Sequence, residues 1–383
     1  MLRIAIVGSA VAGFAAARAL RRQSFDGEIV VVGAERHQPY DRPPLSKDFL
    51  TGACSAADLA LEDPDEDLDL RWRLGTPAGR LDPANRRVVL EDGDEIRADG
   101  VIVATGARAR RLPGGLADAH TLRTLDDAIA LRAALRRGGR LVIIGAGFIG
   151  AEVASGARSL GLDVTVVEAL PTPLAGPLGA EMGAVCAGLH GDHGVRLLTG
   201  VPVAGRNGDA VELADGTLLP ADIVLAGVGA QPNVEWLAGS GLTVDGGVVT
   251  DEAGATNLPN VVATGDCATS FNRHAGRAIR VEHWTHAFEQ PAAAVATLLG
   301  RVVPDRPNVP YFWSDQYGVR IQFAGHREDG DTVRIVEGDT EQRSFLAVYE
   351  RDGRPVAVLG MNQPKLFTRW RRQLRAPISS PAP

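Results

Sequence analysis

Residues 145–150 have the composition and spacing of a dinucleotide-binding loop. They read GAGFIG, follow an apolar run and precede a predicted helix. In such a loop the first glycine permits a tight turn, the second lets the backbone approach a pyrophosphate, and the third lets helix and strand pack closely. The free N–H groups at the helix N-terminus attract phosphate oxygens. We therefore predict that Gly145, Gly147 and Gly150 help to bind a dinucleotide.

The acidic residue that accompanies this motif is Glu168, at the end of the next predicted strand. Its carboxylate is expected to accept hydrogen bonds from the 2′- and 3′-hydroxyls of a ribose. No Lys or Arg stands between Glu168 and Glu181, so this stretch offers nothing to neutralise a 2′-phosphate. The sequence therefore favours NADH over NADPH.

A second loop of this kind, residues 8–13, reads GSAVAG and departs from the pattern at Ala10. The methyl group of Ala10 limits how closely a pyrophosphate can approach without excluding one. Gly8 and Gly13 keep the other two positions, and Glu35 beyond the next strand is the candidate for a ribose. A protein with two such loops usually holds FAD in one and a nicotinamide cofactor in the other. We expect FAD in this first loop.

Two further apolar runs end in turns of small residues. Residues 101–107 read VIVATGA and residues 261–266 read VVATGD. The carboxylate of Asp266 is placed to hydrogen-bond the ribityl hydroxyls of a flavin. The residues that we expect to border the FAD here are Ala104, Thr105, Gly106, Gly265 and Asp266.

Both glycine-rich loops belong to βαβ units, which form an internal repeat. The expected order is strand 2–7, helix 14–22 and strand 28–32 in the first unit, and strand 141–144, helix 151–160 and strand 163–167 in the second. Their continuous β-branched runs are typical of parallel strands covered on both faces. We therefore predict an α/β fold with two doubly wound, Rossmann-like dinucleotide-binding domains, one for FAD and one for NAD.

The C-terminal part of the chain has a different pattern. Three prolines between Pro304 and Pro310 indicate a linker, and the runs after it alternate like antiparallel strands, which predicts an α+β domain. The Pro/Ser-rich tail, 376–383, is expected to be disordered. The predicted division is 1–110 and 236–304 for the two parts of the FAD-binding domain, 111–235 for the NAD-binding domain, and 305–383 for the C-terminal α+β domain.

Composition and charge narrow the classes of function. The chain of 383 residues carries 40 Lys and Arg against 47 Asp and Glu, and this net charge of −7 argues against nucleic acid as a partner. No run of about 18 apolar residues is present, so we expect no membrane span. The N-terminus is too rich in glycine for a signal peptide, which predicts a cytoplasmic protein. Cys54, Cys186 and Cys267 lie too far apart for a CxxC motif, and we expect no metal site.

Several longer motifs resemble the ferredoxin reductases of oxygenase systems, within the FAD-dependent pyridine nucleotide-disulfide oxidoreductase superfamily. They span almost the whole chain. The motifs are PYDRPPLSKDFL at 39–50, LRTLDDA at 122–128, EHW at 282–284 followed by Ala287 and Gln290, and FWSDQY at 312–317.

The resemblance implies a set of cofactor-binding residues. Trp284 is implied to lie against the isoalloxazine ring, and Lys47 near flavin N5, where it could pair with Glu152. Trp313 is implied to lie between the flavin and a protein partner or, equally, to be an ordinary buried tryptophan. The implied FAD residues are Ala12, Glu35, Arg42, Lys47, Ala78, Arg123, Asp266 and Trp284. The implied NADH residues are Gly147, Ile149, Glu152, Glu168 and Gly229.

Composition singles out Lys47 independently. Of the 40 basic residues only Lys47 and Lys365 are lysines, so an ordinary surface cation in this chain is an arginine. A compact ammonium instead of a planar guanidinium is what this position requires. Together with the positions that the resemblance implies, this predicts that Lys47 and Glu152 are the orienting, catalytic residues, with no nucleophile, no general base and no metal.

The resemblance implies an NADH-dependent ferredoxin reductase. Residues 42–47 match the region where disulfide reductases of the superfamily carry a thiol, yet they contain none. Electrons should therefore leave singly from FAD to a [2Fe–2S] ferredoxin that serves a cytochrome P450 or a Rieske-type oxygenase. The alternatives are an NADH oxidase, a rubredoxin or monodehydroascorbate reductase, or a redox-controlled binding protein like apoptosis-inducing factor. Arginines expected to receive an acidic ferredoxin are Arg273, Arg277, Arg280, Arg369, Arg371, Arg372 and Arg375.

Overall fold

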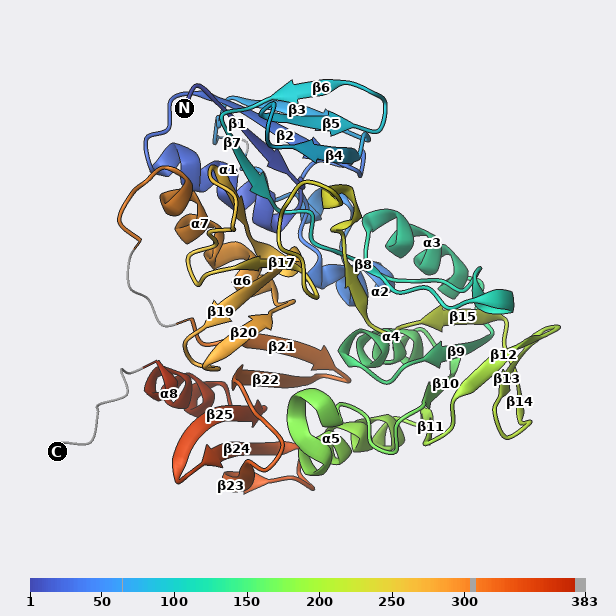
Figure 1. The fold of residues 1–383 in the computed structure, drawn as a ribbon. Coiled ribbons are helices and arrows are strands. Elements are labelled where there is room, and N and C mark those ends of the chain that lie inside the picture. Colours follow the sequence, from blue (N-terminus) through green and yellow to red (C-terminus); the bar gives the residue numbers. More distant parts are fainter. Residues whose placement is uncertain (64, 304–307, 376–383) are drawn as a thin grey trace.

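The structure is a computed structural model that describes residues 1–63, 65–303 and 308–375 (Figure 1). Its first part is built on a five-stranded parallel sheet. The sheet order is β18 (Val261–Ala263), β7 (Gly100–Val103), β1 (Arg3–Val7), β2 (Glu28–Gly33) and β3 (Leu70–Leu74). Because β1 is central, loop 8–13 leaves the sheet at its carboxyl edge, where open α/β sheets bind ligands.

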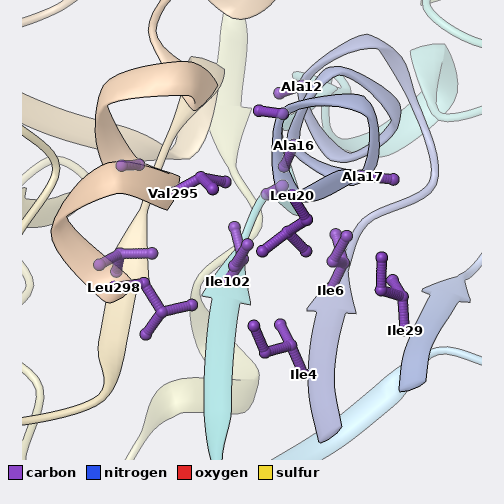
Figure 2. Close-up of a cluster of buried hydrophobic side chains, with 14 of the residues drawn as sticks. Ile4, Ile6, Ala12, Ala16, Ala17, Leu20, Ile29, Ile102, Val295 and Leu298 are labelled. Atoms are coloured by element: carbon purple, nitrogen blue, oxygen red, sulfur yellow. The ribbon is translucent and has the colours of Figure 1, made fainter. Parts of the chain in front are cut away.

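Alternate side chains of β1 face two different cores. Ile4 and Ile6 point toward α1 (Val11–Arg22) and α7 (Pro291–Leu298), as Figure 2 shows. Ala5 and Val7 face a three-stranded antiparallel sheet that covers the opposite side. That sheet comprises β4 (Ala78–Asp82), β5 (Arg87–Leu90) and β6 (Glu95–Arg97). The parallel sheet is thus buried on both faces, which explains its nearly continuous apolar strands.

The second part repeats this plan. Its four-stranded parallel sheet has the order β11 (Arg196–Thr199), β10 (Asp163–Glu168), β9 (Arg140–Ile144) and β15 (Ile223–Ala226). One face packs on α3 (Leu125–Leu135) and α4 (Phe148–Ser159), and the other is covered by an antiparallel sheet. The covering strands are β12 (Val203–Asn207), β13 (Ala210–Leu213) and β14 (Leu218–Pro220). The internal repeat in the sequence therefore corresponds to two copies of one architecture.

Two short strands run side by side where the chain passes between these parts. β8 (Ala107–Ala109) pairs antiparallel with β16 (Ala230–Pro232). After β16 the chain returns to the first part, where β18 joins the large sheet. The remaining helices and strands of the first part are α2 (Asp48–Thr51), β17 (Val248–Thr250), β19 (Ala268–Asn272), β20 (Arg277–Arg280) and α6 (Trp284–Glu289).

The C-terminal part is an antiparallel sheet, as its alternating pattern predicts. Its order is β21 (Tyr311–Gln316), β22 (Val319–Gly325), β25 (Arg354–Met361), β24 (Ser344–Arg351) and β23 (Thr332–Asp339). On one face packs α8 (Pro364–Leu374), through residues such as Phe367. On the other face packs α5 (Ala175–Asp192), through Leu178 and Met182. This sheet therefore shares a core with a helix of the second part.

The predicted helices and parallel strands are present, with shifted ends. The helices expected at 14–22 and 151–160 begin at Val11 and Phe148, because the last residues of each glycine-rich loop already form a helical turn. Residues 304–307 of the predicted linker and the predicted disordered tail, 376–383, lie outside the described residues. Among the helices that the structure describes, none is long and apolar enough to cross a membrane.

Candidate functional site

A cavity of about 1220 Å³ lies where the two parallel-sheet parts meet the C-terminal sheet. Its wall includes Gly8 and Ala12 from the first loop and helix, and Gly147 and Ile149 from the second. Pockets for drug-sized ligands measure about 300–1,000 Å³, so this cavity has room for an extended ligand. The other predicted residues on its wall are Glu35, Arg42, Lys47, Ala104, Thr105, Gly106, Arg123, Glu152, Gly229, Asp266 and Trp284.

Three glycines of the two loops lie behind the cavity wall, where they avoid steric conflict. Gly145 has a φ of 100°, and a Cβ there would lie 2.4 Å from a backbone carbonyl oxygen. A Cβ at Gly150 would lie 2.3 Å from the carbonyl oxygen of Gly145, and one at Gly13 would lie 1.7 Å from that of Gly8. At Gly147, by contrast, a Cβ would have no neighbouring atom within 4 Å. The glycines thus divide into those that shape the loops and one that leaves room for a ligand.

The helices that follow the loops present uncapped first turns. Ala10 at the start of α1 and Gly147 at the start of α4 make no side-chain cap hydrogen bond. The first N–H groups of a helix have no partner within the helix, and both first turns contribute residues to the cavity wall. Each turn can therefore receive a phosphate.

On the side of the first loop, five residues form a continuous series of polar contacts. The Glu35 carboxylate accepts from Arg42 Nη2 at 2.6 Å and from the Tyr40 hydroxyl at 2.5 Å. Arg42 also donates to the backbone carbonyl of Arg123, whose Nη2 donates to Asp266 Oδ2 at 2.5 Å. Burial raises the pKa of Tyr40, so its hydroxyl stays protonated and donates. The series fixes this wall of the cavity.

Glu152 is a buried carboxylate on α4 that contacts all three parts of the chain. It is 4% exposed, and its Oε2 accepts from Lys47 Nζ at 2.7 Å and from the Ser46 hydroxyl. Its Oε1 accepts from the Ser314 hydroxyl of β21 at 2.6 Å, and that hydroxyl accepts from Gln316. These donors offset the cost of removing a carboxylate from water. The structure thus brings Lys47 and Glu152 together, and adds Ser314.

Sequence reasoning missed the role of Ser314. The residue belongs to the FWSDQY motif, so a signal was present, but it pointed to the family and not to a contact. Ser314 and Glu152 are 162 positions apart. Only the packing of β21 against α4 brings them together.

Aromatic side chains lead from the cavity wall toward the C-terminal sheet. The Trp284 indole N–H donates to Asp41 Oδ1 at 2.6 Å, and its ring lies edge-to-face with that of Trp313, with centroids 6.0 Å apart. Trp313 stacks on Tyr311, again at 6.0 Å, and the Arg371 guanidinium lies 3.9 Å above the Tyr311 ring. Both tryptophans border the cavity. They therefore connect its interior to a cationic surface.

His283, next to Trp284, presents an incompletely bonded polar atom at the cavity wall. Within the described residues its buried Nδ1 has no hydrogen-bond partner. Burial lowers the pKa of His283 to about 4, so the ring is neutral at neutral pH. A buried polar atom without a partner lowers the stability of the fold.

Besides the loop glycines, three predicted residues do not line the cavity. Ala78 begins β4 and packs against the core under that sheet. Gly265 turns against α1, where a Cβ would collide with a helix side chain. Glu168 accepts the backbone N–H groups of Ala146 and Leu170, both at 2.9 Å, so it holds the second loop to β10. Each of its oxygens keeps a lone pair for a ribose hydroxyl.

The arginines expected to receive a partner fall into two groups. Arg273, Arg277 and Arg280 each pair with a carboxylate, and Arg280 also donates to the backbone of Asp266. The exposed loop before β3 carries the acids Glu66 and Asp69, which pair with arginines of α1, and this helix lies away from α8 in Figure 1. The exposed arginines in α8 and at its C-terminal end are Arg369, Arg372 and Arg375. The second group therefore offers the more positive surface.

Sequence and structure comparisons relate the chain to known proteins. The family model of pyridine nucleotide-disulphide oxidoreductases matches residues 2–291, and a reductase C-terminal model matches residues 311–382. Rhodocoxin reductase of Rhodococcus erythropolis is 39% identical over 374 residues, which cover 95% of this chain and 87% of the relative. Putidaredoxin reductase of Pseudomonas putida is 36% identical over 379 residues, covering 95% and 89%.

Solved structures agree with these sequence relatives. The covalent complex of putidaredoxin reductase with putidaredoxin contains a chain that is similar to this one with a TM-score of 0.92 and 34% identity. The match covers 97% of this chain and 93% of that chain. The predicted fold class, with two Rossmann-like units and a C-terminal α+β unit, is confirmed.

Proposed function

Because the chain belongs to the pyridine nucleotide-disulphide oxidoreductases, which confirms the resemblance seen in its motifs, we propose that it is an NADH-dependent ferredoxin reductase. It transfers hydride from NADH to FAD and single electrons onward to a [2Fe–2S] ferredoxin. That ferredoxin in turn serves a cytochrome P450 or a Rieske-type oxygenase. The relatives named rhodocoxin reductase and putidaredoxin reductase support this assignment.

The first-loop side of the cavity fits FAD. The uncapped first turn of α1 suits the pyrophosphate, and Glu35 and Asp266 each keep lone pairs for sugar hydroxyls. FAD, when bound, supplies the conversion of a two-electron donor into two one-electron transfers. The chain positions it through Ala12, Arg42 and Arg123, as well as Thr105, Gly106, Asp266 and Trp284.

The second-loop side fits NADH. Gly147 has the open space that a pyrophosphate needs, and Glu168 keeps acceptor positions for the ribose hydroxyls. Ile149 and Gly229 lie on the cavity wall between this loop and the first-loop side. These residues would hold the nicotinamide nucleotide so that its reactive end points into the shared cavity.

One observation carries the proposal: the Lys47–Glu152 pair, at 2.7 Å, lies on the wall of the cavity into which both loops open. Lys47 comes from the first part and Glu152 from the second, so the pair marks the place where the two cofactors would meet. The ammonium can stabilise negative charge that develops during hydride transfer. Glu152 holds that ammonium in place, and Ser46 and Ser314 hold Glu152.

Electrons leave, in this proposal, past Trp284 and Trp313 to a ferredoxin that docks on the α8 surface. An acidic partner would be attracted by Arg369, Arg372 and Arg375. The stacking of Trp313 on Tyr311 and the cation of Arg371 extend the cavity wall to that surface.

We also propose that the protein works in the cytoplasm. Its three cysteines are free, which suits a reducing compartment, and NADH is supplied there.

Anaerobic reduction of an acidic [2Fe–2S] ferredoxin by NADH tests the function. The purified protein should be yellow with noncovalent FAD, and should reduce the ferredoxin stoichiometrically, two molecules for each NADH. Ferricyanide serves as the control acceptor that needs no docking. Rapid NADH turnover with ferricyanide or O₂ without any reduction of ferredoxin would overturn the proposal.

A further inference from the structure

Helix α5 of the second part is interrupted near its start. Gly179 has φ 78° and ψ 159°, which are not helical values, and Leu174 just before the helix is in the left-handed region at φ 57°. Besides any bonds within the helix, the turn 174–179 that precedes this break receives hydrogen bonds from outside α5.

The C-terminal part of the chain supplies the donors of these hydrogen bonds. Arg327, in the loop after β22, donates through Nη1 to the carbonyl oxygens of Ala175 at 2.9 Å and Gly176 at 2.7 Å. The Tyr349 hydroxyl on β24 donates to the carbonyl oxygen of Leu178 at 2.6 Å. Both donors come from a part of the chain more than 150 positions away.

Arg327 is itself held in place. Its side chain is only 11% exposed, and its Nη2 donates to Asp329 at 2.5 Å. A guanidinium can serve two carbonyls and a carboxylate at once because its donors form a rigid planar fork, whereas an ammonium has no such geometry. The position thus has a clear requirement for arginine.

The turn held in this way belongs to the wall of the candidate NADH site. Pro177 borders the cavity, as do Gly147 and Ile149 of the second glycine-rich loop. The stretch from Glu168 to Glu181 contains no cation of its own. Arg327 reaches this stretch from the C-terminal part of the chain and donates to its backbone carbonyls.

We infer that Arg327 is a positioning residue for NADH: it holds the turn 174–179 in the conformation that completes the NADH-side wall, so the C-terminal domain helps to build the NADH site. This role presupposes the proposed use of NADH. It assigns the C-terminal domain a task separate from docking the electron acceptor. A turn that is ordered before binding raises affinity, because less conformational freedom is lost when the ligand arrives.

The test compares Arg327→Met with the matched Arg334→Met, by NADH kinetics with ferricyanide as acceptor. Arg334 pairs with Glu350 on the same sheet but has no contact with α5 among its hydrogen bonds in the structure. We expect Arg327→Met to raise the KM for NADH by about 5- to 30-fold, the ratio that one to two kcal/mol of lost preorganisation produces. The kcat and FAD content should stay close to those of the wild type. Arg334→Met should leave the KM unchanged.

Two milder variants keep the inference testable if Arg327→Met folds poorly. Arg327→Lys retains charge but loses the fork, and Tyr349→Phe removes one donor, so each should raise the KM by about 2- to 5-fold. Hydrogen exchange at residues 175–180 should be faster in every Arg327 variant, and NADH should slow it.

A wild-type KM for NADH in a folded, FAD-loaded Arg327→Met protein would overturn the inference. Equal loss of kcat, FAD content and thermal stability without a KM change would also overturn it, since that pattern indicates a purely structural role. Because ferricyanide replaces ferredoxin in these assays, either result leaves the test of the ferredoxin reductase proposal intact.

Discussion

The two dinucleotide sides of the cavity are built on the same architecture but are secured differently. On the first-loop side, a series of charged and polar contacts runs from Glu35 to Asp266 and is complete without a ligand. On the second-loop side, Ile149 is exposed and the turn around Pro177 depends on Arg327 from another part of the chain. The first side suits a cofactor that stays bound, and the second suits one that must leave after each turnover.

The origin of the charge-assisted hydrogen bonds distinguishes the two sides. On the first-loop side they join residues of the wall to one another, whereas the turn on the second-loop side is held by Arg327 from the C-terminal sheet. A rigid site around NADH would slow the release of NAD⁺. Substitutions in the Lys47–Glu152 pair, which lies between the two sides, and on each side separately test this contrast.

Lys47→Met should have the largest effect, because it removes the ammonium from a buried carboxylate. We expect the free energy of unfolding to fall by about 3–5 kcal/mol, the usual cost of leaving one buried charge without its partner. Flavin reduction by NADH should slow in the same variant. Guanidinium denaturation and stopped-flow absorbance measure the two effects.

Lys365→Met is the matched control, since it replaces the chain's other lysine on exposed α8. It should change neither stability nor flavin reduction. If Lys47→Met is as stable as the wild type, Glu152 does not depend on the ammonium.

Glu168→Gln should alter the choice of nicotinamide nucleotide. In the wild type we expect kcat/KM for NADH to exceed that for NADPH by about 30- to 1000-fold, which corresponds to ~2–4 kcal/mol for a 2′-phosphate against an unpaired carboxylate. Glutamine keeps an oxygen that can accept the Ala146 N–H, so the loop should keep its conformation. The ratio of kcat/KM for NADH to kcat/KM for NADPH should fall. Steady-state kinetics with both nucleotides measure it, and Glu181→Gln is the control. An unchanged ratio would remove Glu168 from nucleotide selection.

Arg42→Met should weaken the first-loop side selectively. The Kd for FAD should rise by about 10- to 100-fold, because hydrogen bonds to charged groups contribute about 1.5–3 kcal/mol. Flavin absorbance after dialysis measures the loss. The KM for NADH should be normal once FAD is restored. Arg36→Met, at a neighbouring exposed arginine, should retain FAD, and loss of FAD from both variants would contradict the specific role of Arg42.

Arg372→Glu should have the smallest effect, confined to the protein partner. The KM for ferredoxin should rise by up to about 10-fold and the rate should fall with added salt, because steering by surface charge is screened. Arg372 is a better test position than Arg277 or Arg280, since both of those arginines pair with carboxylates. Arg196→Glu on β11, at the opposite end of Figure 1 from α8, is the control. If Arg372→Glu and Arg196→Glu change the KM for ferredoxin equally, the α8 surface is not the docking site.

Local patterns in the sequence were sufficient for the repeated βαβ architecture. The steric requirements of Gly145 and Gly150 are met within one loop and its neighbouring strand, so spacing alone predicts them. The pairing of Lys47 with Glu152 needed the family resemblance, because no periodicity links positions 105 apart. The antiparallel sheets that cover both parallel sheets were largely unpredicted, since their short strands carry a weak alternating signal.

Contacts of the C-terminal sheet were beyond sequence reasoning. The hydrogen bonds from Ser314 to Glu152 and from Arg327 to the turn 174–179 depend on how that sheet packs against α4 and α5. Neither serine nor arginine has a distinctive local pattern at these positions. The exposure of Arg372 and the pairing of Arg280 likewise became evident only in three dimensions.

The pairing of β8 with β16 has a consequence for the history and redesign of this chain. Ala109 lies opposite Ala230, so the segment between them leaves and re-enters the first part at neighbouring points. Segments with adjacent ends can be inserted into a host, or excised and replaced by a tight turn, without stretching any connection. The second part of the molecule is thus attached as an insertion with adjacent ends, and a chimera made by exchanging residues 110–229 should leave the first part with its own strand order.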